Sequence, residues 1–119
     1  MDIASIFSGH LSTKEATQAV INKLIHNLES EGTITGYTFS SIVSEMATVS
    51  EPVREACSAL YEYIQQIYYL KLENEGFSQE SASAIALLMT ASIEGAMMLC
   101  LTQKSSQPLK TIGTLLPSI

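Results

Sequence analysis

Arginine is nearly absent from this chain. Arg54 is the only arginine among six basic residues, which face 12 acidic ones, and the formal net charge is −6. Proteins that bind nucleic acid usually place several arginines and lysines against phosphates and base edges. The composition therefore argues against nucleic-acid binding by this chain alone, and we expect no sequence-specific affinity for DNA.

Cysteine is also scarce, with only Cys57 and Cys100, both inside helical patterns and without a partner motif. Isolated cysteines of this kind are usually small buried hydrophobic residues rather than disulfide partners. The first ten residues, MDIASIFSGH, lack the charged start and the long apolar core of a secretory signal. We therefore expect reduced thiols and a cytoplasmic location.

Catalytic and metal-binding motifs are missing as well. His10 and His26 do not have the one-turn spacing of paired metal ligands. The serines are numerous, but none occupies a nucleophile-elbow motif, and there is no glycine-rich loop for a phosphate. The sequence predicts a protein that is not an enzyme and holds no metal or cofactor.

The chain has no long alternating strand pattern, so we expect an all-α fold in a single domain, residues 1–119. Ser12 or Thr13, Ser50 and Ser78 are suited to cap helices. Gly76 is suited to end one, and residues 2–10 form a short apolar segment. The five expected helices are residues 13–30, 38–48, 51–75, 79–103 and 107–117.

Residues 78–103, SQESASAIALLMTASIEGAMMLCLTQ, are the most apolar stretch of the chain. A helix that is apolar on nearly every side needs cover on nearly every side, and a chain this short offers few partners of its own. Small residues would let a second helix approach closely. We therefore expect a homodimer through this helix and the last one. The residues expected at the interface are Ala84, Ala91, Gly95, Met98, Leu109, Ile112 and Leu116.

A membrane span is the rival interpretation, because residues 82–101 are about long enough to cross a bilayer. Six Leu and Ile residues in this window favour insertion by roughly 0.3 to 0.6 kcal/mol each. The central charge of Glu94 costs about 2.5 to 3.5 kcal/mol. Because the sum is close to zero, we expect a buried helix and no membrane contact.

Glu94 admits two readings, because a carboxylate among apolar neighbours must be paired, hydrogen-bonded, protonated or facing solvent. It could lie at the rim of a dimer or bond a neighbouring helix terminus. It could instead be a polar anchor inside a ligand cavity. Aromatic and Met residues at helical spacing in the middle helices fit a packed core as well as a cavity wall.

Four short motifs, in order and at matching spacing, resemble the C-terminal half of TetR-type transcriptional regulators of the LmrA/YxaF-like branch. They are Gly36-Tyr37-Thr38, Ser50-Glu51-Pro52-Val53-Arg54, Glu94-Gly95 and Pro108-Leu109. The branch usually has Gly-Cys-Pro at the first, so Tyr37-Thr38 is a departure. The resemblance covers about residues 13–119, and the helix-turn-helix head of the family is not in this sequence.

The resemblance implies a domain that joins two subunits in a four-helix bundle of their last two helices and encloses a pocket for a small, often apolar effector. Effector binding would shift the spacing of the DNA-binding heads, and a repressor is the usual arrangement. The expected ligand-binding residues are Phe39, Val43, Met46, Tyr61, Ile64, Met89 and Glu94. The alternatives are a freestanding helical protein-interaction adaptor and a small membrane-associated protein.

Overall fold

The structure is a computed structural model that describes residues 3–29 and 50–116. Every regular element in these ranges is a helix. They are α1 (Ile3–Phe7), α2 (Thr13–Glu29), α4 (Glu51–Asn74), α5 (Gln79–Gln103) and α6 (Gln107–Leu115). The expected all-α fold is confirmed, and four of the expected helices are present within two residues of their expected ends. The fifth, residues 38–48, lies outside the described residues.

Local sequence signals explain where these helices begin. The Ser12 hydroxyl accepts from the amide of Glu15, whose carboxylate accepts in return from the amide of Ser12, both at 3.1 Å. This reciprocal arrangement is a capping box. Ser50 and Ser78 cap α4 and α5 through the amides of Val53 and Ser81. Three of the serines that the sequence marks as caps therefore act as caps.

The helices end as their sequences predict. After α4 the chain turns at Gly76, whose φ of 101° favours glycine because it has no Cβ to clash. Within the short apolar segment near the start of the chain, Ile3–Phe7 form helix α1, and α6 ends at Leu115, two residues before Pro117.

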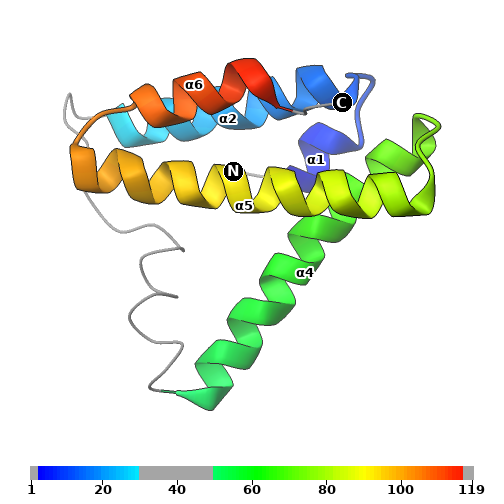
Figure 1. The fold of residues 1–119 in the computed structure, drawn as a ribbon, viewed down its shortest axis with the longest axis horizontal. Helices are drawn as coiled ribbons and strands as arrows, with labels where there is room; N and C mark the ends of the chain where they lie inside the picture. Colours follow the sequence, from blue (N-terminus) through cyan, green and yellow to red (C-terminus); the bar gives the residue numbers. More distant parts are fainter. Residues whose placement is uncertain (1–2, 30–49, 117–119) are drawn as a thin grey trace.

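The described helices form a layered arrangement around α5. In Figure 1, α6 and α2 run alongside α5, whereas α4 crosses it obliquely and its first half projects away from the other described helices. The core lies where α2, α4, α5 and α6 meet, and its fully buried side chains include Ile21, Leu72, Met89 and Leu109. Cys57 and Cys100 are buried free thiols, as expected.

Two distant contacts hold α2 against the rest of the molecule. At its start, the Thr13 amide and hydroxyl both donate to the Glu75 carboxylate, at 2.8 and 2.6 Å. At its end, Glu29 accepts from the Ser106 hydroxyl and pairs with Lys110 at 3.7 Å. The turn after α4 and the start of α6 therefore fix both ends of α2.

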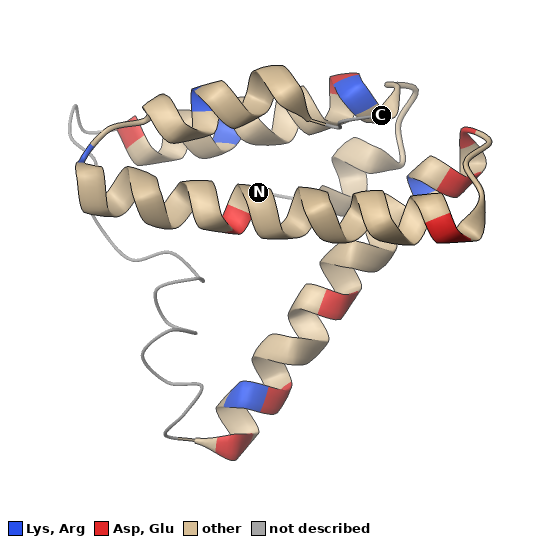
Figure 2. Ribbon diagram, in the orientation of Figure 1, with Lys and Arg blue, Asp and Glu red and all other residues tan. Residues whose placement is uncertain are grey.

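Helix α5 carries little charge along its length (Figure 2). By length and composition alone it could cross a membrane, and 39% of its most apolar window is buried inside the molecule. The same composition is common in the central helices of soluble proteins, so this finding is weak evidence for a membrane span. The packing of α5 against α4 and α6 accounts for part of its apolar surface.

Candidate functional site

A partly enclosed cavity of about 170 Å³ lies between α1, α2, α4 and α5. An engineered apolar cavity of about 150 Å³ is enough to bind benzene, so the space suits a small aromatic molecule. The wall is mainly aliphatic. Its lining residues are Ile3, Val20, Leu24, Leu60, Ile64, Tyr68, Thr90, Ile93, Glu94 and Met97.

Among the described residues that line this cavity, Glu94 carries the only carboxyl group, and none carries a basic side chain. The Tyr61 hydroxyl, on α4, donates to Glu94 Oε2 at 3.1 Å. This bond joins α4 to α5 beside the cavity and orients the carboxylate. The bond satisfies one of the several acceptor positions of the carboxylate.

Tyr68 connects the cavity to α1. Its side chain is 2% exposed and lines the cavity, and its ring lies 5.1 Å from that of Phe7 at 58°. Burial raises the pKa of Tyr68, and the nearby negative charge of Glu94 adds to the rise. The hydroxyl therefore stays protonated and able to donate.

Thr90 completes the polar groups at the wall, but its hydroxyl already donates to the Ala86 carbonyl at 2.8 Å. Backbone bonding of this kind lets a hydroxyl sit on an apolar surface at low cost. The other polar residues among the described lining are Glu94 and Tyr68.

The structure brings together part of the expected ligand site. Ile64 and Glu94 line the cavity, and Tyr61 is hydrogen-bonded to Glu94. Met89 lies in the core instead, at 0% exposure, and does not line this cavity. The remaining expected wall residues, Phe39, Val43 and Met46, fall outside the described residues.

The site residues predicted from the sequence do not include the part of the cavity wall that α1 and α2 form. Ile3 on α1 and Val20 and Leu24 on α2 line the cavity. Val20 and Leu24 recur at helical spacing in α2, but this pattern is the same whether the inward face of the helix meets a packed core or a cavity. No feature of the sequence separates these two environments.

The opposite side of α5 carries an apolar groove shared with α6, with a volume of about 510 Å³. Small residues form its floor on α5, among them Ala91, Ser92 and Gly95, and Pro108 and Ile112 border it on α6. Large apolar side chains are exposed on the same two helices, including Leu87 (56%), Leu99 (49%) and Leu115 (62%).

The expected dimer-interface residues divide into two groups. Ala84, Ala91 and Gly95 are exposed on α5, and Met98 and Ile112 are half-buried. Leu109 and Leu116, at 0% and 4% exposure, are buried within the chain itself. Their side chains pack between α6 and the rest of the chain, so they expose almost no surface to a second subunit. Leu109 and Leu116 therefore face inward, whereas Leu115 on α6 is exposed.

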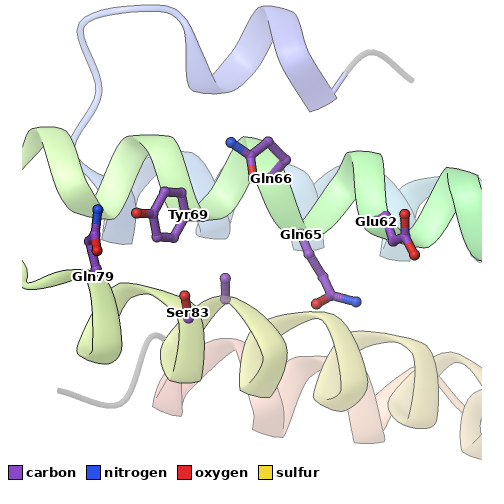
Figure 3. Close-up of a pocket in the computed structure, with 7 residues that line it drawn as sticks. Glu62, Gln65, Gln66, Tyr69, Gln79 and Ser83 are labelled. Carbon is purple, nitrogen blue, oxygen red and sulfur yellow. The ribbon is translucent and has the colours of Figure 1, made fainter.

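A second, polar groove of about 520 Å³ lies on the outer side of the α4–α5 pair (Figure 3). Glu62, Gln65, Gln66 and Tyr69 border it on α4, whereas Gln79 and Ser83 border it on α5. Among residues 3–29 and 50–116, no group of His, Cys, Asp and Glu side chains could hold a metal ion.

The chain is similar to bacterial transcriptional regulators. Residues 13–115 match the family described as transcriptional regulator LmrA/YxaF-like, C-terminal domain. The chain is 33% identical over 103 residues to the uncharacterized HTH-type transcriptional regulator YxaF of Bacillus subtilis (strain 168), over 87% of this chain and 54% of that protein. It is 31% identical over 117 residues to the HTH-type transcriptional regulator LmrA of the same organism, over 98% and 62%. The chain thus spans less than two thirds of either relative.

Proposed function

The chain belongs to the LmrA/YxaF-like C-terminal domains of TetR-type transcriptional regulators, and from this premise we propose that it binds a small, largely apolar effector and joins two subunits. The family is one of regulator domains and not of enzymes. Its place of action would be the cytoplasm.

The observation that carries the effector proposal is the cavity of about 170 Å³, whose wall is mainly aliphatic and includes the polar residues Tyr68, Thr90 and Glu94. Ligand sites in proteins are typically apolar hollows in which a few polar groups fix the orientation of the ligand. The outer groove of Figure 3 is bordered mainly by polar side chains and suits an apolar molecule less well.

The α5–α6 face supports the proposal of a homodimer. Several leucines of α5 and α6 are exposed to solvent, and exposed apolar surface of this kind often marks a site of protein association. The small residues Ala91 and Gly95 leave room for another helix. The cavity residues Thr90, Ile93 and Met97 lie on the opposite side of α5. Effector and second subunit can therefore bind at the same time.

The proposed regulation is a shift between two conformations. Both relatives are named HTH-type regulators, so DNA would be bound by a helix-turn-helix domain joined to a domain of this kind. An effector changes the population of the DNA-binding arrangement only if it binds one arrangement more tightly. Because α1 contributes Ile3 to the cavity wall, an occupied cavity touches the helix nearest the N-terminus. A repressor released by its effector fits this arrangement.

Toluene provides a direct test of the cavity, because it is neutral, apolar and of suitable size. Titration of the chain, followed by amide NMR, should shift the signals of residues around 60–68 and 90–97. The variant Leu24→Trp fills the cavity from α2 and should abolish these shifts. Leu11→Trp, at an exposed position in the turn before α2, is the control and should bind as the wild type does. Absence of binding to the wild type would refute the effector proposal.

A protein-interaction adaptor is the second candidate, because the exposed leucines of α5 and α6 would also suit a different protein. Sedimentation of the purified chain separates the two. A dimer supports the regulator domain, whereas a monomer at micromolar concentration favours the adaptor. Aggregation that detergent reverses would instead favour a membrane-associated protein.

A further inference from the structure

The residues that line the cavity differ in how far they are exposed, and this difference locates its opening. We propose that the cavity is a channel with one mouth, at Leu60 on α4, and that its ligand is an amphiphile. The apolar end of the ligand enters toward Tyr68, and its polar end stays at the mouth in water. This inference rests on the proposed effector site and specifies the ligand of that site.

Leu60 marks the mouth. It is 41% exposed, and among the described residues that line the cavity it is the only exposed one. It belongs to the first half of α4, which projects away from the other described helices (Figure 1). None of the described residues that line the α5–α6 groove also lines the cavity. The mouth is therefore separate from the surface proposed for a second subunit.

Exposure falls inward from the mouth along one face of α4. Leu60, Ile64 and Tyr68 follow one another at steps of four residues and therefore share a face of the helix. Leu60 is exposed, Ile64 is half-buried and Tyr68 is 2% exposed. With a rise of about 1.5 Å per residue, these positions span about 12 Å. The deep end of the channel is therefore at Tyr68, toward the turn at Gly76.

The neighbouring helices close the deep part of the channel. Val20 on α2 and Thr90 and Ile93 on α5 are buried and line it. These three side chains are aliphatic apart from the Thr90 hydroxyl, which is bonded to the Ala86 carbonyl. An apolar group gains free energy on entering such surroundings, whereas an unpaired polar group loses its hydration there. The apolar end of the ligand therefore enters first.

The size of the channel explains why the other end of the ligand is polar. A volume of about 170 Å³ suits one ring or a short chain, so a larger molecule extends past Leu60 into solvent. A polar group keeps its hydration there, whereas an apolar group would remain exposed to water. A molecule with one apolar end and one polar end matches both environments.

A series of straight-chain primary alcohols, from butanol to decanol, tests for the mouth by titration calorimetry. While the chain fills the channel, each added methylene should tighten binding about fourfold. Longer alcohols should then bind with nearly constant affinity, because the added part of the molecule lies outside the channel. A closed cavity would instead lose binding once the chain is too long, and that result would overturn the proposal.

Leu60→Trp tests the position of the mouth, because a larger side chain there narrows the entrance. Toluene should enter and leave at least tenfold more slowly, with an affinity within about twofold of the wild-type value, as measured by NMR exchange. Leu60→Ala should make both steps faster. Leu70→Trp, at a position of α4 that is 52% exposed and does not line the cavity, is the matched control and should change neither rate.

These outcomes separate the mouth from the site. Unchanged exchange in Leu60→Trp, or a lower affinity without slower exchange, would place the entrance elsewhere and overturn the proposal. If toluene binds but the longer alcohols do not, the cavity remains and only the mouth is refuted. If neither toluene nor any alcohol binds, the effector site itself is refuted.

Discussion

Tyr68 contacts both the candidate site and the N-terminal helix α1. It is almost fully buried, its ring packs on Phe7, and it borders the cavity beside Glu94. A phenol can occupy such a place because it is largely apolar and carries a single polar atom at its tip. Its buried surroundings favour the neutral form over the phenolate.

We predict that the buried neutral form of Tyr68 makes stability fall at high pH. Its pKa is raised in the folded chain, whereas in the unfolded chain a tyrosine has a pKa of about 10. Its contribution is therefore complete below pH 10 and is lost as the pH rises, by about 1.4 kcal/mol per unit. Urea unfolding between pH 9 and pH 12 should show a shallower decline in Tyr68→Phe. Identical slopes would contradict this account.

Met89 and Ile64 differ in what surrounds them, and their truncation should differ accordingly. Met89 is fully buried, so Met89→Ala should lower the free energy of unfolding by about 2–5 kcal/mol. Ile64 is half-buried and faces the cavity, so Ile64→Ala should cost only roughly 1–2 kcal/mol. Thermal and urea melts measure both, and toluene affinity should fall in Ile64→Ala. Equal losses of stability in the two variants would indicate that the space near Ile64 is filled.

At the scale of elements, glycines in adjacent helices have opposite surroundings. A Cβ added at Gly113 on α6 would lie 3.2 Å from Ile21 Cγ2 on α2, whereas one added at Gly95 on α5 would meet nothing within 4 Å. The Gln18 side chain also donates to the Gly113 carbonyl. Glycine therefore lets α6 approach α2 closely at one site, and leaves the surface of α5 open at the other.

We expect Gly113→Val to destabilise the chain by about 1–3 kcal/mol, because buried Ile21 has little room to move away. The same substitution at Gly95 should leave the stability of the monomer unchanged or slightly higher, since valine favours a helix more than glycine does. Urea denaturation of both variants at a concentration that keeps the chain monomeric makes the comparison. A stable Gly113→Val variant would show that α6 can shift away from α2.

At the scale of the whole molecule, α5 separates two surfaces that have different proposed roles. The cavity lies on one side of the helix and the α5–α6 groove on the other. None of the described residues that line this groove is charged. One apolar helix can therefore serve both a ligand site and a subunit interface.

Gly95→Leu tests the interface, because a larger side chain fits the isolated chain but would collide with a second helix. We expect the dimer dissociation constant to rise tenfold or more, in line with an overpacking cost of about 1–3 kcal/mol. Sedimentation velocity over a range of concentrations measures it. Ala59→Leu, at an exposed position of α4, is the matched control. An unchanged profile for Gly95→Leu would place the interface elsewhere.

The chain alone should show no sequence-specific affinity for DNA. Its net charge is −6, and its basic residues are scattered over α2, α4, α6 and the turn after α5 (Figure 2). Such scattered charges neutralise few phosphates at once. A gel-shift titration at physiological salt should show no retarded band, and a specific complex would contradict the prediction.

The sequence by itself determined the helices and the family, since both depend on local signals. Ser12, Ser50 and Ser78 mark helix starts through bonds to amides a few residues ahead, and Gly76 permits a left-handed turn. Short motifs in the order and at the spacing of the family carry the resemblance. The sequence also predicted the buried thiols. Glu94 and Ile64, which it predicted in one ligand site, line the same cavity, and the ligand site itself stays a prediction.

Only the tertiary structure decided which apolar faces meet protein and which border open space. Met89 on α5 and Ile64 on α4 both follow the apolar spacing of their helices. Met89 lies in the core, whereas Ile64 lines the cavity. Leu109 and Leu116 follow an apolar stripe that could face a partner, and they are buried within the chain instead. The spacing of apolar residues predicts which face of a helix is turned toward the rest of the protein. The surroundings of that side chain depend on how α1, α2 and α4 pack around α5, which is set by contacts between residues distant in the sequence.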